Sequence, residues 1–189
     1  MKARAAATWP VPVMREEERV RAFESIFARE FDYVCHNARR LGVPSKDIED
    51  LAHDVFVTVY RKLPDYDEQR PFRPWLFAIV FRTAVAHLRR ARNRVELMDD
   101  RSESIADESA QADELLETEQ THDRVRRAFE RLNPDKRGIL LMHDVEGCTV
   151  PVIAEALGIP LNTAYTRLRA ARLELRKILV ALQDSEETP

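Results

Sequence analysis

The apolar side chains between Glu16 and Leu41 recur every three or four residues, and this spacing limits the possible fold more than any other feature of the chain. They are Val20, Phe23, Phe27, Phe31, Val34, Ala38 and Leu41. Spacing of this kind places the apolar groups on one face of an α-helix. Similar patterns follow along most of the 189 residues, which are enough for one domain or two small ones. The chain is therefore predicted to be all-α.

Two further helices are expected before residue 95. Gly42 and Pro44 end the first helix, and Ser45 is a suitable N-cap for a second helix that runs to about Leu63. The prolines and aspartates of residues 64–71 predict a loop. A third helix then begins at Phe72 or Arg73 and runs to about Arg94. Together these helices predict a first domain over residues 16–94.

An acidic stretch divides the chain in two. Residues 95–123 hold eleven carboxylates, one arginine and no aromatic side chain. Such a composition buries too little apolar area to offset the entropy lost on ordering. Residues 96–111 are therefore expected to be a mobile linker, whereas residues 112–121 have a pattern compatible with a helix. The predicted boundaries are 95–120 for the linker and 121–182 for a second domain.

The second domain has the pattern of a helix-turn-helix. Helices are predicted around Val125–Leu132 and from Pro134 to Val145, and a short helix, Val150–Leu157, precedes a long one from about Leu161 to Leu182. Gly158 lies between the last two, where a left-handed residue permits the turn. The long helix has DNA-contacting residue types opposite its apolar stripe. These candidates are Asn162, Thr163, Tyr165, Thr166, Arg167, Arg169 and Arg172. The competing interpretation is an antiparallel helix pair with a salt-bridged exterior.

The end of the third helix is strongly basic. Four arginines fall within six residues, Arg89, Arg90, Arg92 and Arg94. They are suited to binding phosphates. Cations at a helix C-terminus also complement the helix dipole. Composition alone therefore leaves open whether these arginines bind phosphates or only stabilise the end of the helix.

Several classes of function are disfavoured by the residues present. With four glycines, no phosphate-binding glycine loop can be assembled, and the two cysteines, Cys35 and Cys148, have no metal-ligand spacing. No nucleophile, base and orienting group occur in a recognisable pattern, so no enzyme, metal or cofactor is expected. No secretory signal or membrane-length apolar run is found, which favours a cytoplasmic protein.

Two helical segments with basic surfaces, joined by an acidic linker, resemble a known family. The chain is similar to the extracytoplasmic-function group of sigma-70 family sigma factors, which keep only domains 2 and 4, over roughly residues 17–182. The resemblance rests on DIEDLAHDVFVTVYRKL (residues 47–63), FRPWLFAIVFRTAVAHLRRARNR (residues 72–94) and the segment from Leu132 to Leu179. It implies a subunit that directs core RNA polymerase to promoters and initiates transcription.

The resemblance also implies roles for particular residues. The residues expected to bind the polymerase clamp are Asp47, Asp50, His53 and Asp54. Those expected around a captured base of the −10 element are Tyr66, Phe72, Arg73 and Arg82, with Arg89, Arg90, Arg92 and Arg94 on phosphates. In the second domain, Thr163 and Arg167 would contact phosphates, while Tyr165, Thr166, Arg169 and Arg172 would read the −35 element. The acidic linker would either enter the RNA channel of polymerase or serve as a solvated tether.

The sequence departs from the family pattern near the −10 residues, so the resemblance does not give the promoter sequence. Arg82 stands where Asn is usual, and His53-Asp54 replaces the usual Gln-Glu pair. The implied partners are the core polymerase β and β′ subunits, promoter DNA, and an anti-sigma factor that would wedge between the two domains. One alternative is a sigma-like decoy that binds an anti-sigma factor and never engages DNA. A dimeric helix-turn-helix repressor would leave residues 45–94 unexplained.

Overall fold

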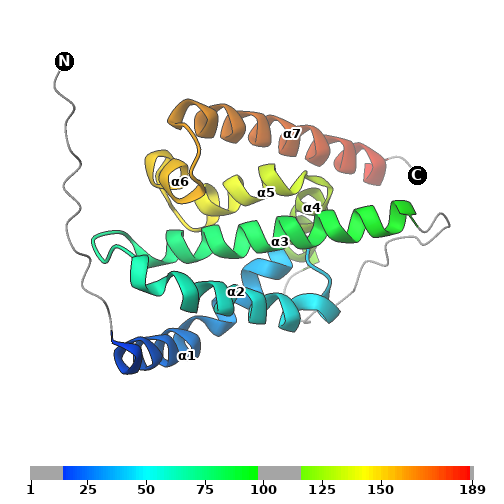
Figure 1. Cartoon of the computed structure of the whole chain (residues 1–189). Helices are drawn as coiled ribbons and strands as arrows, with labels where there is room; N and C mark the ends of the chain where they lie inside the picture. Colours follow the sequence, from blue (N-terminus) through cyan, green and yellow to red (C-terminus); the bar gives the residue numbers. More distant parts are fainter. Residues whose placement is uncertain (1–14, 98–115, 188–189) are drawn as a thin grey trace, which may run out of the picture.

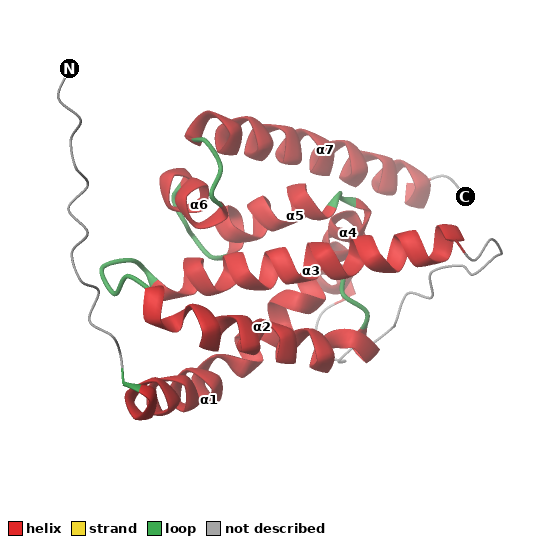
Figure 2. Cartoon of the chain, in the orientation of Figure 1, coloured by secondary structure: helices red, strands yellow, loops and turns green. Residues whose placement is uncertain are grey.

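The computed structural model describes residues 15–97 and 116–187, and side chains within 15–93 and 123–185. Every regular element in these residues is helical, as Figure 2 shows, which confirms the predicted all-α class. None of the described helices is both long and apolar enough to cross a membrane.

The first unit is built from three long helices. They are α1 (Glu16–Arg40), α2 (Ile48–Lys62) and α3 (Phe72–Leu97), with short 3₁₀ turns η1 (Ser45–Asp47) and η2 (Leu63–Asp65) on either side of α2. Their shared core includes Val34, Val55 and Phe77, each at most 1% exposed. Gly42 follows α1 at φ +91°, a left-handed conformation that favours glycine and turns the chain towards α2.

The described part of the second unit, residues 116–187, contains four α-helices and one π-helical turn. These are α4 (Leu116–Arg131), α5 (Pro134–Leu140), η3 (Leu141–Val145, π-helical), α6 (Val150–Leu157) and α7 (Leu161–Glu187). Asn133 caps α5, because its side chain accepts a hydrogen bond from the backbone N–H of Asp135 at 2.9 Å. Gly158 has φ +66° between α6 and α7, as the turn of a helix-turn-helix requires.

The two units pack directly against each other. In Figure 1, α3 lies with α2 on one side and α5 and α6 on the other, while α7 forms the outer edge beyond them. Buried residues of both units join into one continuous apolar cluster, which includes Phe81 of α3 and Leu140 of α5. Of the expected linker, residues 95–120, the first three residues belong to α3 and the last five to α4, and residues 98–115 lie outside the described residues.

Local departures from the predicted helices have identifiable causes. Ser45 does not cap an α-helix, because Pro44 leads into the 3₁₀ turn and α2 starts three residues later. The predicted helix from Pro134 to Val145 changes to π geometry at Leu141. Helix α3 continues three residues past Arg94, and α4 begins at Leu116. Apolar periodicity does not detect these changes, since each preserves the buried face.

Candidate promoter and polymerase interfaces

The exposed face of α7 brings the predicted DNA-contacting residues together. Ala164, Leu168 and Ala171 are at most 5% exposed and fix α7 against the rest of its unit. The side chains of Asn162, Tyr165, Thr166, Arg167, Arg169 and Arg172 are exposed, while Thr163 is half-buried. This is the geometry of a recognition helix: a packed apolar stripe on one side and polar, cationic groups on the other.

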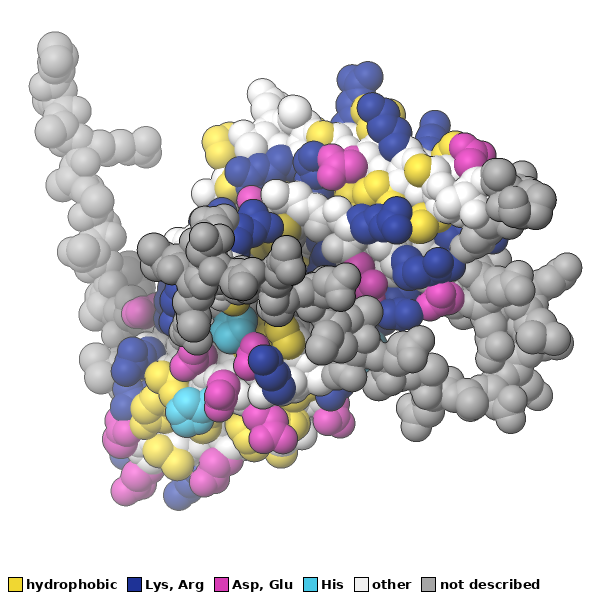
Figure 3. Space-filling view, turned by 90° about the vertical axis from the view of Figure 1, so that its right-hand side faces the viewer, with side chains coloured by type: hydrophobic (Ala, Val, Ile, Leu, Met, Phe, Trp, Pro, Cys, Tyr) yellow, Lys and Arg dark blue, Asp and Glu magenta, His cyan; other side chains and the backbone are white. Residues whose placement is uncertain are grey.

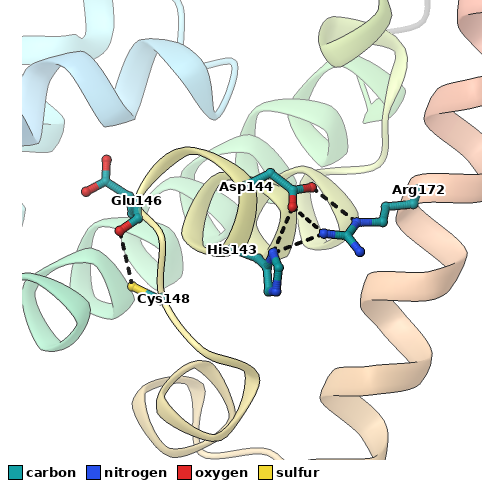
Figure 4. Close-up of polar contacts among 5 residues, drawn as sticks. All are labelled: His143, Asp144, Glu146, Cys148 and Arg172. Carbon is teal, nitrogen blue, oxygen red and sulfur yellow. Dashed lines mark hydrogen bonds and ion pairs between the residues drawn. The ribbon is translucent and has the colours of Figure 1, made fainter.

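Arg172 differs from the other predicted contacts because its side chain bonds to residues of another helical element. Its guanidinium hydrogen-bonds both carboxylate oxygens of Asp144 and lies 3.1 Å from Nδ1 of His143, as Figure 4 shows. Burial alone would raise the pKa of Asp144, but hydrogen bonds from Arg172 and His143 outweigh this effect and lower that pKa. Arg172 therefore ties α7 to the π-helical turn.

An aromatic group forms where the loop before α3 meets that helix. The rings of Tyr66, Phe72 and Trp75 lie 4.8–5.5 Å apart between centroids, and the hydroxyl of Tyr66 donates to the carbonyl of Arg70. Tyr66 and Phe72 are half-buried, so their rings are only partly covered. Partly exposed aromatic faces are suitable for stacking an unpaired base.

Arg73 lies near this aromatic group but points to α1. Its Nε is 3.5 Å from Oε2 of Glu30, a carboxylate whose side chain is only 4% exposed, and its guanidinium lies over the ring of Tyr33. The hydroxyl of Tyr33 donates to the carboxylate of Glu146 at 3.1 Å, and burial and that carboxylate raise the pKa of Tyr33 well above its usual range. This polar group connects the two units.

The remaining predicted −10 residues are arginines along α3. Arg82 donates to the carbonyl of Ala156 in α6 at 2.6 Å, and Arg89 lies 3.8 Å from the carboxylate of Asp135 in α5. Arg90 and Arg92 are exposed to solvent. Arg94 lies on α3, with its side chain outside the described part.

The predicted clamp-binding residues lie along the outer face of α2. Asp50, His53 and Asp54 are exposed, whereas Leu51, Val55 and Phe56 between them are buried. Asp47 differs, because its carboxylate is 3.2 Å from Nε2 of His87 on α3 and only half-exposed. The surface available to a partner is therefore centred on Asp50, His53 and Asp54.

The two ends of the molecule differ in charge. On the face shown in Figure 3, lysine and arginine side chains gather on the upper half, which carries α7, and acidic side chains are more frequent on the lower half with α1 and α2. A basic surface favours phosphates and an acidic one repels them. This division agrees with DNA contacts at α7 and protein contacts at α2.

Sequence reasoning missed several residues that hold the units together. Arg70 pairs with Glu155 of α6 at 3.1 Å. Arg137, 5% exposed, donates to backbone carbonyls of Glu130 and Leu132 within the second unit and packs against Gly42 of the first. The sequence marks only one such position, Gly138. It is a glycine inside a helix, where alanine would be more stable by about 1 kcal/mol.

Comparisons with known proteins match this geometry. Residues 26–94 match the family model "Sigma-70 region 2" and residues 122–175 match "Sigma-70, region 4". The chain is 28% identical to RNA polymerase sigma factor CnrH of Cupriavidus metallidurans, over 88% of this chain and 90% of that protein. It is also 28% identical to the ECF RNA polymerase sigma-E factor of Escherichia coli K12, over 69% of this chain and 72% of that protein.

Solved structures share this fold. The structure of CnrH in complex with the cytosolic domain of CnrY matches with a TM-score of 0.57 and 26% identity, covering 86% of this chain and 90% of that one. The sigma factor RpoE in complex with the anti-sigma factor NepR, from Bartonella quintana, matches in fold with a TM-score of 0.67 and 21% identity, covering 84% and 97%. The helix-turn-helix, the helical first unit and these matches agree, and the chain belongs to the extracytoplasmic-function group of sigma-70 family RNA polymerase sigma factors.

Proposed function

We propose that residues 16–94 bind core polymerase and capture the −10 strand, and that residues 121–182 read the −35 element. The observation that carries this proposal is the exposed face of α7. Tyr165 and Arg169 point outward from the first half of a helix whose opposite face is packed. An arginine that contacts guanine in two places provides about 1–3 kcal/mol of discrimination against other bases.

The α2 surface supports polymerase binding. Asp50 and Asp54 are one helical turn apart and exposed, with His53 beside them. Carboxylates at this spacing on a rigid helix are suited to basic side chains of a protein partner. Asp47 contributes indirectly, by holding α3 through His87.

The start of α3 supports capture of an unpaired base. Tyr66 and Phe72 offer ring faces, and Arg82, Arg89, Arg90 and Arg92 form a line of cations that follows the same helix. Promoter melting needs both, because stacking holds the extruded base and the arginines hold its backbone. The chain acts without chemistry of its own, in the cytoplasm where polymerase works.

An anti-sigma factor is the expected regulator. CnrH has been solved with the cytosolic domain of CnrY and RpoE with the anti-sigma factor NepR, and we extend this kind of partner to the present chain. The two units of this chain contact each other directly, so a partner wedged between them would first have to separate them. Recovery of such a partner with the tagged chain from its own host tests this part.

The direct test of the function is transcription in vitro. The purified chain is added to core polymerase on a library with randomised −35 and −10 elements, and transcripts are sequenced. Enrichment of one pair of elements at fixed spacing is expected. A chain that binds an anti-sigma factor but gives no transcripts would instead be the decoy, and a chain that binds neither would contradict both.

A further inference from the structure

A buried carboxylate on α1 holds two arginines beside the aromatic group of the −10 site. We propose that Arg29 and Arg73 bind backbone phosphates of the −10 strand, and that Glu30 is the positioning residue that orients both guanidinium groups for this contact. The inference rests on the proposed role of α3 in capturing an unpaired base. It adds α1 to the −10 surface, since neither Arg29 nor Glu30 is among the residues expected there from the sequence.

Glu30 is buried although it carries a charge. Its side chain is 4% exposed, and an unpaired carboxylate in the interior would be strongly destabilising. Its Oε1 accepts a hydrogen bond from Nε of Arg29 at 2.8 Å, and its Oε2 lies 3.5 Å from Nε of Arg73 on α3. Oε2 has no hydrogen-bond donor among the described residues, so the nearby charge of Arg73 is what compensates it.

Each arginine also lies over an aromatic ring. The guanidinium carbon of Arg29 is 5.7 Å from the ring centre of Phe72, and that of Arg73 is 5.1 Å from the ring centre of Tyr33. A cation over a ring face is attracted by the electrons of the ring. Phe72 belongs to the aromatic group at the start of α3. Arg29 is thus held at the edge of the group that would stack the extruded base.

The outer ends of both guanidinium groups are left for another ligand. The contacts with Glu30 use Nε of each arginine, and the side chains of Arg29 and Arg73 are 58% and 63% exposed. The Nη groups of an arginine form a fork of donors that matches the oxygens of a phosphate. A nucleotide whose base stacks on Phe72 has a phosphate on each side, and an arginine beside that ring is placed to bind one of them.

Other roles for Glu30 lead to different expectations. If Glu30 only fastens α1 to α3, loss of its charge would change stability and leave the contacts with the strand unchanged. If Glu30 acts on DNA through its charge alone, its removal would strengthen strand binding, because a carboxylate repels phosphates. Only a positioning role predicts that removing this negative charge weakens strand binding.

The test uses the full chain assembled with core polymerase. Arg29→Ala and Arg73→Ala each remove one guanidinium group, and Glu30→Gln removes the carboxylate charge while keeping the shape of the side chain. The matched controls are Arg21→Ala and Glu24→Gln, which make the same changes of charge at exposed positions of α1. Affinity for core polymerase is measured for every variant, so that a defect in assembly is recognised.

The probe is a fluorescent single strand with the −10 element selected by the transcription experiment, and a scrambled strand of the same length is measured beside it. Anisotropy gives the affinity at several salt concentrations. The slope of log affinity against log salt concentration reports the phosphates neutralised, at about 0.7 per phosphate for a single strand.

Phosphate contacts predict losses that do not depend on the base sequence. We expect Arg29→Ala and Arg73→Ala each to weaken binding to both strands about fivefold and to reduce the salt slope by about 0.7. Glu30→Gln should weaken binding to both strands about threefold and also reduce the slope, with affinity for core polymerase unchanged. Arg21→Ala and Glu24→Gln should leave the slope as in the wild type.

The outcomes separate this inference from the function it rests on. If the three variants match their controls while the wild-type holoenzyme binds the strand and transcribes, the inference is overturned and the function stands. Stronger strand binding by Glu30→Gln would overturn the positioning role. A loss confined to the selected strand, with an unchanged salt slope, would overturn the phosphate contacts, because it would indicate a base contact.

Two further results are also decisive. If Glu30→Gln fails to assemble with core polymerase, the two exposed arginines decide the matter, since their substitution leaves no buried charge without a solvent-exposed partner nearby. A wild-type holoenzyme that binds neither strand and gives no transcripts would remove the proposed function and this inference together.

Discussion

Helices α3 and α7 both have exposed, arginine-rich faces, but the arginines of α3 also contact the other unit. Arg82 and Arg89 of α3 are exposed but contact oxygens of Ala156 in α6 and Asp135 in α5, whereas Arg167 and Arg169 of α7 are exposed on the outer face of their helix. A residue's type shows that it can bind phosphate; its neighbours show whether it is free to do so. Substitutions in each region test this difference, and the one with the largest expected effect comes first.

The outer face of α2 is exposed and acidic, and the two arginine-rich faces can be compared with it. Asp50→Arg together with Asp54→Arg should reduce core polymerase binding at least about 100-fold, because opposed like charges replace attraction at a protein interface. A pull-down with core polymerase measures this. Glu17→Arg with Glu24→Arg, on α1, is the control for charge alone. Full binding by the α2 variant would mean that polymerase contacts another surface.

The exposed arginine of α7 should contribute directly to promoter affinity. Arg169→Ala is expected to weaken binding to the selected −35 duplex by about 1–3 kcal/mol, with core polymerase affinity unchanged. Anisotropy titrations on the selected and a scrambled duplex give the difference. An equal loss on both duplexes would show that Arg169 contacts phosphate rather than a base.

Two glycines with positive φ test the packing of Arg137 against Gly42, where the two units meet; Gly147 is the control. Gly42→Ala and Gly147→Ala should each cost about 1–2 kcal/mol, the strain of a left-handed alanine. Gly42→Ala should cost about 1 kcal/mol more, because its methyl displaces Arg137 from two backbone carbonyls, while nothing lies within 4 Å of a Cβ on Gly147. Urea unfolding measures both. Equal losses would show that Arg137 adjusts without cost.

The smallest effect is expected where α7 is tied to the π-helical turn. The lowered pKa of Asp144 means that its contacts stabilise the fold above the pKa of the unfolded carboxyl, and that this stabilisation is lost as pH falls through the folded pKa. Because the pair is partly exposed, Asp144→Asn should cost only about 0.2–1 kcal/mol at pH 7. Urea unfolding at pH 7 and at pH 3 measures it, and the difference between the two proteins should be smaller at pH 3. An undiminished difference at pH 3 would contradict the ion pair.

Sequence patterns predicted the individual helices better than their arrangement. The spacing of apolar residues gave α1 nearly to the residue, the end of α2 and the start of α7, and Gly158 gave the turn before α7, because these depend on local conformation. Helix α2 begins three residues after Ser45, and α7 continues five residues past the predicted end at Leu182. The same spacing predicted that Asp50 and Asp54 are exposed, because they lie on the side of α2 opposite its apolar residues. Periodicity shows which face is buried but not what covers it.

The contacts between the units illustrate what could not be predicted. Phe81 continues the apolar stripe of α3 and gives no indication that α5, 57 residues further along at Gly138, packs on it. Arg172 has the residue type of a base contact, yet Asp144 holds it. In both cases the decisive partner is distant in sequence.

The most direct test of the central claim is photocrosslinking to one promoter, with and without core polymerase. A benzoylphenylalanine at position 165 of α7 should crosslink to −35 DNA in both states, because that face is open. The same group at position 82 of α3 should crosslink to the −10 strand in the presence of polymerase, because the bases of that strand are unpaired only in the open promoter. No crosslink from position 82 in the presence of polymerase, or none from position 165 in either state, would contradict the account.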